Sequence, residues 1–440
     1  MGYEECCCAL WERTASQRAG DAAGTARMLE RALAELPECA PLSRAQLVES
    51  LAVAASYAEA DPDQPPAAQV QQGADRWLAA IAEQLGIVGS GGPVLGAALF
   101  RELCAARVQP YFARASGGSQ QQQQFALAGD ARPATLIDAP PKWKQWPQSV
   151  AAFVWAFRHL ADSEIQDAVP WILPVVVALA DDYECGAKLR GLRLAQQLLA
   201  RADGEFLRRS GVGAVIDSSA RGCLTYRSDA GDRAPALLAA AFQTAIAAGD
   251  VVRPSAADPQ RTAQWWTLVD RLITNDVYIA ENVAATAALC AQIEPLCRRL
   301  GPAIARYLRA LVGVVVHPLR SQAHLAPAVC AMHQVLVQQI QALAAACPER
   351  VRAYACELVA AMAVSWDSTA SPRAAALQDQ IARLRSLTLD AVRQIAALDP
   401  AAVAAAVQRL DSGRPGVFGE WAAAVTATTE QPQQTEKQDP

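Results

Sequence analysis

The sequence contains few of the residues on which acid–base and nucleophilic catalysis depend. It has four histidines in 440 residues, and no serine stands in the Gly-x-Ser-x-Gly pattern of a nucleophile elbow. Ser218 and Ser219 lie in a predicted helix that contains no histidine. A histidine-based mechanism therefore has few candidates, and we expect no enzymatic activity.

Blocks of one charge and long apolar runs are also scarce. Acidic and basic residues are interspersed, with a net charge of -5, whereas nucleic-acid-binding domains usually carry a basic stripe. The longest apolar runs, near 169–180 and 311–316, are shorter than the roughly 20 residues that span a bilayer. We therefore expect no direct contact with nucleic acid and none with a membrane.

The twelve cysteines are scattered rather than grouped at metal-ligand or disulfide-framework spacing. No signal peptide opens the chain, so reduced, buried thiols in a cytosolic or nuclear protein fit best. Met1-Gly2 ahead of Cys6-Cys7-Cys8 suggests N-myristoylation as an alternative. That motif takes Ser or Thr where Cys6 stands, so we favour a plain helix start.

Alanine and leucine supply most of the 52% hydrophobic content, and aromatic residues make up only 6%. Both are strong helix formers, and alternating runs of Val, Ile or Thr that would indicate strands are scarce. The sequence therefore predicts an all-α protein. The segments with helical periodicity are 24–36, 43–59, 67–85, 93–113, 148–160, 163–180, 187–202, 212–224, 235–248, 259–274, 278–297, 302–316, 326–346, 348–364 and 372–410, the last broken before Asp399.

Helix pairs recur about every 40 residues after Trp143, the period of HEAT and armadillo units. Several starts share a capping residue followed by proline: Asp258-Pro259, Gly301-Pro302, Ser371-Pro372 and Asp399-Pro400. We predict an α-solenoid of antiparallel helix pairs. Its regions are N-terminal helical repeats at 1–115, a low-complexity linker or disordered insertion at 116–141, a HEAT-like solenoid at 142–411 and a disordered tail at 412–440.

The solenoid is organised around a helical hairpin at 172–201. An apolar run ends at an acidic turn, Asp181-Asp182-Tyr183-Glu184, and an amphipathic helix follows. Gly191 in that helix costs about 1 kcal/mol relative to Ala, so we expect it to allow another backbone to approach closely. Asp182 of this turn is placed to meet an arginine such as Arg190 of a neighbouring unit.

This stretch resembles the central signature of the Tel-two-interacting protein two family. The signature is an apolar helix, an Asp-Asp-Tyr turn, a Lys-Leu-Arg-Gly-Leu helix, a Ser-Gly-x-Gly link and a helix ending near Cys-Leu. The matching residues are Asp181, Asp182, Tyr183, Lys188, Leu189, Arg190, Gly191, Leu192, Leu207, Arg209, Ser210, Gly211, Gly213, Cys223 and Leu224. The resemblance covers roughly 150–367 and is absent before Trp143.

The resemblance implies a non-catalytic scaffold, without cofactor, that binds the other two large helical subunits of the TTT co-chaperone complex, mainly the largest one. That complex helps to mature and stabilise phosphatidylinositol 3-kinase-related kinases with the heat-shock-protein-ninety machinery. Effects on telomere and DNA-damage signalling would be indirect. The protein would be located in the cytoplasm and the nucleus. The alternative is another HEAT-type adaptor, such as a transport receptor or a phosphatase scaffold.

Three other features are candidates for a site. His324, Cys330 and His333 are the best metal ligands by spacing, but a zinc site would need further ligands, so we predict no metal. The Gly-rich loop 86–92 lacks the Lys-Ser/Thr of a P-loop and is expected to be flexible. Trp265 and Trp266 are possible interface anchors, since adjacent helical residues point about 100° apart and one of them can be exposed.

Overall fold

The computed structural model describes residues 3–13, 21–36, 42–59, 67–89, 92–112, 141–225, 228–255, 258–279, 282–321, 326–369 and 377–430. Within these ranges nearly all elements are helices, so the all-α prediction is confirmed. Packing divides the chain into two compact units. Unit 1 comprises Met1–Ala178 and Ala200–Phe206, and unit 2 comprises Leu179–Leu199 and Leu207–Pro440.

Unit 1 is a helical bundle with one small hairpin of strands. Its elements are α1 (Tyr3–Glu12), α3 (Ala22–Glu35), α4 (Arg44–Ala58), α5 (Ala68–Leu85), β1 (Val88–Gly89), β2 (Gly92–Pro93), α6 (Ala97–Arg107), α7 (Gln109–Phe112), α9 (Lys142–Gln145), α10 (Pro147–His159), η1 (Asp162–Glu164) and most of α11 (Ile165–Ala180).

Helix α4 is the centre of unit 1. Apart from the exposed Glu49, the run from Leu47 to Ala55 is buried, and α1, α5, α6 and α10 pack against the helix. Its start follows the predicted chemistry, because Ser43 and Gln46 form a reciprocal capping box. Unit 1 is therefore a closed bundle around one buried helix.

Unit 2 continues with helices in chain order. They are α12 (Cys185–Arg201), α13 (Gly204–Arg209), α14 (Val212–Gly222), η2 (Ser228–Arg233), α15 (Ala234–Val252), α16 (Pro259–Ile279), α17 (Val283–Cys290), α18 (Ile293–Leu300), η3 (Gly301–Tyr307), α19 (Leu308–Ser321), α20 (Pro327–Ala346), α21 (Pro348–Val351), η4 (Arg352–Tyr354), α22 (Ala355–Ser368), α23 (Gln378–Leu398), α24 (Pro400–Gly413) and α25 (Gly419–Glu430). The segment Ala200–Phe206, which contains the end of α12 and the start of α13, belongs to unit 1.

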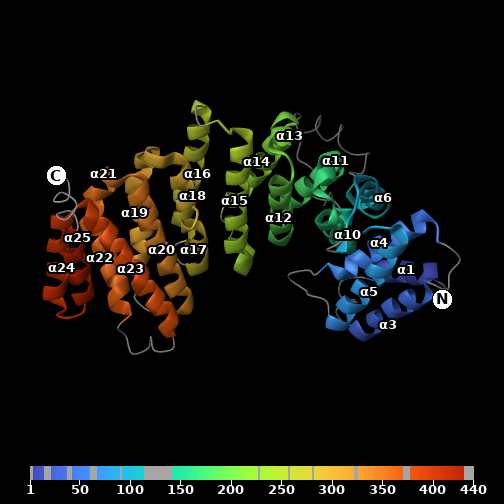
Figure 1. The fold of residues 1–440 in the computed structure, drawn as a ribbon, viewed down its shortest axis with the longest axis horizontal. Helices are drawn as coiled ribbons and strands as arrows, with labels where there is room; N and C mark the ends of the chain where they lie inside the picture. Colours follow the sequence, from blue (N-terminus) through green and yellow to red (C-terminus); the bar gives the residue numbers. More distant parts are fainter. Residues whose placement is uncertain are drawn as a thin grey trace, which may run out of the picture. The chain divides into compact units, whose positions relative to one another are not determined.

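The helices of unit 2 stack in two layers (Figure 1). One layer runs α15, α17, α20, α23 and α25, and the other runs α16, α19, α22 and α24, each helix packing on the next in its layer. Successive pairs such as α19 with α20 and α22 with α23 connect the layers. This arrangement buries both apolar faces of each hairpin and is the predicted solenoid.

Polar contacts in unit 2 repeat at the spacing of the helix pairs. They join residues between 37 and 53 positions apart: Gln196 with Ala240, Asp250 with Arg299, Asp270 with Tyr307, Glu294 with Gln339, Gln341 with Gln394, Arg352 with Asp399, and Asp367 with Arg414. Each repeat is thus tied to its neighbour.

Two predicted helix boundaries, at Pro93 and within 278–297, are wrong. Pro93 does not begin a helix; it lies in β2, paired with Val88, and α6 begins at Ala97. The described part of the Gly-rich loop therefore forms a short hairpin. The segment predicted as one helix at 278–297 is two helices, α17 and α18, because Asn282 caps a new start and the chain turns at Ala291.

Two of the four predicted starts at proline are confirmed: α16 begins at Pro259 and α24 at Pro400, with the Asp399 side chain accepting from the Ala402 N–H. Gly301-Pro302 opens a 3-10 helix, and Ser371-Pro372 lies outside the described residues.

The predicted disordered tail at 412–440 is wrong for its first part. Trp421 of α25 is completely buried, with its ring against those of Trp366 and Phe418, and Phe418 and Val425 are nearly buried as well. Residues 431–440 and nearly all of the predicted linker at 116–141 lie outside the described residues.

The sequence-based view that no apolar segment is long enough to cross a membrane is also wrong. Asp162–Ala180, Gly231–Val252 and Val283–Ser321 reach that length and apolarity. Between 44% and 56% of the most apolar window of each is buried within the structure. Val283–Ser321 is not one straight helix, since it contains α17, α18, η3 and α19.

Candidate protein-interaction surface

The acidic turn between α11 and α12 has one buried carboxylate and three exposed side chains. Asp182 is 9% exposed, and its Oδ1 accepts a hydrogen bond of 2.8 Å from the Glu184 N–H. Such an Asx-turn fixes the local path of the chain. Asp181, Tyr183 and Glu184 lie at the surface, Tyr183 with 66% of its area exposed. The predicted turn is confirmed, and these three side chains face outward from it.

Lys188 and Cys223 close the end of α11. The Lys188 Nζ donates to the Ala180 carbonyl at 3.0 Å, and the Cys223 thiol donates to the same oxygen at 3.4 Å. Helix C-terminal carbonyls lack intrahelical partners and favour a nearby cation. Burial raises the pKa of the Cys223 thiol, although Lys188 acts to lower it. These two signature residues thus join α11, α12 and α14.

Gly191 allows α12 to pack directly on the end of α11, as predicted. A Cβ at this position would lie 2.5 Å from the Ala180 nitrogen and 2.9 Å from the Leu179 carbonyl carbon. Both are backbone atoms, which cannot move aside as a flexible side chain can. Leu189 and Leu192 flank the glycine and are buried in the core of unit 2.

The Ser-Gly-x-Gly link of the signature also has a structural basis. Gly211 has φ of 76°, a left-handed conformation that favours glycine, at the residue before α14. A Cβ at Gly213 would lie 3.3 Å from Val251 and 3.4 Å from Val252 at the end of α15. Arg209, just before the link, is exposed.

The predicted contact between Asp182 and Arg190 stays a prediction. Arg190 is half-buried, on the helix that follows the acidic turn. Charge pairs between successive repeats do occur elsewhere in unit 2, as between Arg299 Nε and Asp250 at 2.9 Å.

The tryptophan pair on α16 is more enclosed than an exposed anchor requires. Trp265 is 1% exposed, with the Arg299 guanidinium 5.7 Å from its ring. Trp266 is half-buried, and the Arg306 guanidinium lies 4.5 Å from its ring. Trp265 therefore belongs to the core, whereas Trp266 reaches the surface beneath an arginine.

The residues considered for catalysis or metal binding do not converge in the described ranges. His333 is fully buried and its Nδ1 lies 2.9 Å from the Ser365 Oγ; burial lowers its pKa from 6.5 to about 4. Cys330 is buried on the same helix, and His324 lies outside the described residues. No group of three or more His, Cys, Asp or Glu able to hold a metal occurs among the residues that the structure describes.

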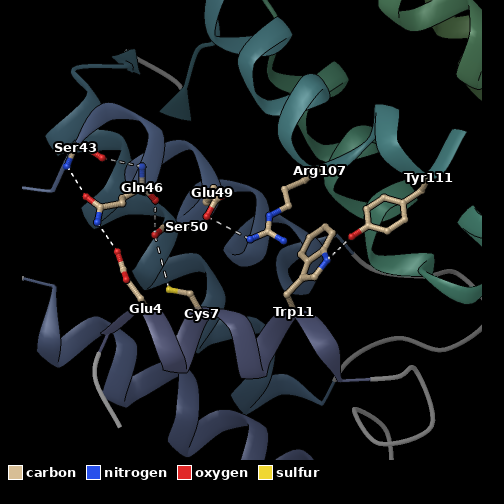
Figure 2. Close-up of polar contacts among 9 residues, drawn as sticks. All are labelled: Glu4, Cys7, Trp11, Ser43, Gln46, Glu49, Ser50, Arg107 and Tyr111. Carbon is tan, nitrogen blue, oxygen red and sulfur yellow. Dashed lines mark hydrogen bonds and ion pairs between the residues drawn. The ribbon is translucent and has the colours of Figure 1, made fainter. Parts of the chain in front are cut away.

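The N-terminal Cys run has a packing role that its sequence did not reveal. Figure 2 shows α1 held against α4 by Glu4, whose carboxylate accepts from the Gln46 amide, and by Cys7, whose Sγ lies 3.8 Å from the Ser50 Oγ. Cys6 and Cys7 are buried, and Cys8 is exposed. Met1-Gly2, on which the myristoylation alternative depends, lies outside the described residues.

Trp11 fixes the other end of α1. Its Nε1 donates to the Tyr111 hydroxyl at 3.1 Å, and the Arg107 guanidinium lies 5.0 Å from its ring (Figure 2). Arg107 also pairs with Glu49 at 3.3 Å. Nothing in the sequence spacing predicts these contacts, since Tyr111 is 100 residues from Trp11.

Comparison with known proteins identifies the family. Residues 98–324, just over half of the chain, match the sequence model of the Tti2 family. The match includes the acidic turn, Lys188, Gly191 and the Ser-Gly-x-Gly link. It begins at residue 98, so the expectation that the resemblance is absent before Trp143 is wrong. No curated protein and no solved structure matches the chain. The chain belongs to the Tti2 family, whose members are non-catalytic co-chaperone adaptors associated with the TTT complex.

Proposed function

We propose that this protein is a non-catalytic scaffold subunit of a TTT-like co-chaperone complex that supports the maturation and stability of phosphatidylinositol 3-kinase-related kinases. The observation that carries the proposal is the family match over residues 98–324. The two-layered stack of unit 2 supports it physically, because solenoids present extended surfaces to other chains.

The proposed partners are the other two large helical subunits of the complex, mainly the largest. The signature turn supports a contact in unit 2. Its structural members, Asp182, Lys188 and Gly191, are turned inward and hold the backbone. Asp181, Tyr183 and Glu184 remain at the surface, and tyrosine is enriched in protein interfaces.

As a subunit of such a complex, the protein would act together with the heat-shock-protein-ninety machinery. Its proposed location is the cytoplasm and the nucleus. Effects on telomeres and on the DNA-damage response would be indirect, through the abundance of the kinases. The proposal includes no direct contact with nucleic acid or membrane.

Co-purification of the tagged full-length protein from its own cells, followed by quantitative mass spectrometry, tests the proposal. The two other TTT subunits are expected at stoichiometric amounts, with the kinases and the chaperone at lower amounts. Recovery of importins or phosphatase subunits at stoichiometric amounts, without the TTT subunits, would overturn it in favour of another solenoid adaptor.

The role of the acidic turn is tested by Tyr183→Ala, with Val364→Ala as a control. Both side chains are exposed in unit 2, so neither change should alter folding. We expect Tyr183→Ala to weaken binding to the purified TTT subunits by about tenfold, as an interface tyrosine does. The control should stay within about twofold. Equal affinities for both variants would remove the turn from the interface.

A further inference from the structure

An arginine lies against two aromatic rings on the surface of unit 2. The Arg306 guanidinium, on η3, lies 4.5 Å from the ring of Trp266 on α16 and 5.6 Å from the ring of Tyr307. Arg306 is exposed, whereas both rings are half-buried. Two aromatic faces thus define the position of one exposed cation.

Carboxylates on α15, on α16 and in the segment between them are engaged by other groups. Asp270 accepts a hydrogen bond of 3.0 Å from the Tyr307 hydroxyl, and burial together with Asp270 raises the pKa of that tyrosine. Asp250 pairs with Arg299 at 2.9 Å, and Asp258 accepts from Arg253 at 3.0 Å. Glu294, the acidic residue nearest to Arg306 in the described part of the chain, pairs with Arg298. These four carboxylates therefore already have partners.

Arg306 makes no hydrogen bond or ion pair with any residue that the structure describes. The indole N–H of Trp266 is also buried without an acceptor in the described part of the chain. Buried donors usually have a partner. The patch formed by Trp266, Arg306 and Tyr307 thus combines two unmet N–H donor groups with a fixed geometry.

A guanidinium held against aromatic rings suits carboxylates. Its five donors form a rigid fork that binds the two oxygens of a carboxylate. Arginine loses rotamer entropy when it is immobilised at an interface, and stacking on two rings reduces that loss. A lysine would keep the charge but would lose the fork and the flat stacking surface.

We propose that the Trp266–Arg306–Tyr307 patch is a docking site for an acidic segment of a partner protein, whose Asp or Glu carboxylate binds Arg306. The inference rests on the proposed function, because it assigns this partner to the same complex. Arg306 is positively charged and has no internal carboxylate partner, so an acidic occupant is complementary to it. A basic or purely apolar occupant would not be complementary.

The test measures binding of the full-length protein to the two purified TTT subunits at about 50 and about 300 mM NaCl, since exposed charge pairs weaken as the Debye length shortens. Arg306→Glu should weaken binding at least about 30-fold, and Arg306→Lys by about fivefold. Arg409→Glu is the matched control, because Arg409 is exposed on α24 and bonds only to its own helix. It should change affinity less than about twofold.

Binding by Arg306→Glu within about twofold of the wild type would overturn the inference and leave the proposed function intact. Failure of the wild-type protein to bind would overturn both. If Arg306→Glu does not fold, as judged by circular dichroism, then Arg306→Lys decides, and unchanged affinity in this variant would overturn the inference.

A photo-crosslinker placed at exposed Ala310, four residues after Arg306, identifies the occupant while the Arg306 guanidinium stays in place. The expected product is a partner peptide with Asp or Glu next to the crosslinked residue. A crosslinked peptide without acidic residues would overturn the inference. Phosphatase treatment of the partner subunits should leave affinity unchanged, and loss of binding after treatment would replace the carboxylate with a phosphoryl group and overturn the proposal as stated.

Discussion

The contacts inside unit 1 and those inside unit 2 join residues at different separations along the chain. In unit 1, Trp11 binds Tyr111 across 100 residues and Gln148 donates to the Trp11 carbonyl across 137 residues. In unit 2, the longest of the polar contacts between repeats described above spans 53 residues. A stack in which each repeat touches its neighbours can lose one repeat at a time, whereas a bundle around one buried helix is expected to unfold as a whole.

The largest effect is expected from Trp11→Ala, because it removes a nearly fully buried ring from unit 1. A loss of about 4 kcal/mol in the free energy of unfolding is typical of such a change. Hydrogen exchange should show reduced protection in all helices of unit 1 and unchanged protection in α20–α25. Loss confined to α1 would contradict the view of unit 1 as one cooperative bundle.

Acidification should destabilise unit 2 through His333. Burial lowers the pKa of this histidine from 6.5 to about 4, so the unfolded state takes up a proton first as the pH falls. Its full contribution is present above pH 6.5 and is lost towards pH 4, by about 3 kcal/mol in total. Urea unfolding of unit 2 at pH 7, 5.5 and 4.5 measures this slope. His333→Gln should flatten it, and an equal slope in that variant would assign the effect elsewhere.

Gly191→Ala and Gly313→Ala separate close packing from helix propensity. A Cβ at Gly191 would meet backbone at 2.5 Å, whereas a Cβ at Gly313 on α19 has nothing within 4 Å. We expect Gly191→Ala to destabilise unit 2 by about 2 kcal/mol and Gly313→Ala to stabilise it by up to about 1 kcal/mol. Thermal melts of both variants check this. If the melting temperatures of both variants shifted in the same direction, the close contact between Gly191 and the α11 backbone would not be what stabilises the hairpin.

The smallest effect on stability is expected from removing one ion pair between neighbouring repeats. Arg352 pairs with Asp399 at 3.3 Å, and more than half of the arginine side chain is exposed. Arg352→Ala should lower Tm by no more than about 2 °C, since exposed ion pairs contribute little. Asp399→Ala should lower it further, because Asp399 also caps α24 through the Ala402 N–H. Equal melting temperatures for the two variants would show that the cap adds nothing.

Local signals in the sequence were sufficient for much of unit 2. The acidic turn, the close approach at Gly191 and the Asp399-Pro400 helix start each depend on a few adjacent residues, so they could be predicted directly. The repeat spacing was visible because the helix pairs follow one another along the chain.

Features that depend on residues far apart could not be predicted. Trp265 and Trp266 are equivalent in sequence, and only the packing of α16 decides that the first is core. Arg306 lies 40 residues from Trp266, so their stacking had no sequence signal. Helix α25 was hidden by the Gly, Pro and polar residues on either side of it, although the spacing of Phe418, Trp421 and Val425 places them on one helical face.

Helix α25 has a consequence for self-association of the stack. Its inner face is filled by Trp421 and Val425, while Glu420, Ala422, Ala423 and Thr426 lie outside. Another copy docking end-on would meet small or hydrophilic groups and would gain little from excluding water there. Docking of another copy through this face, and growth into fibres by that route, are therefore disfavoured.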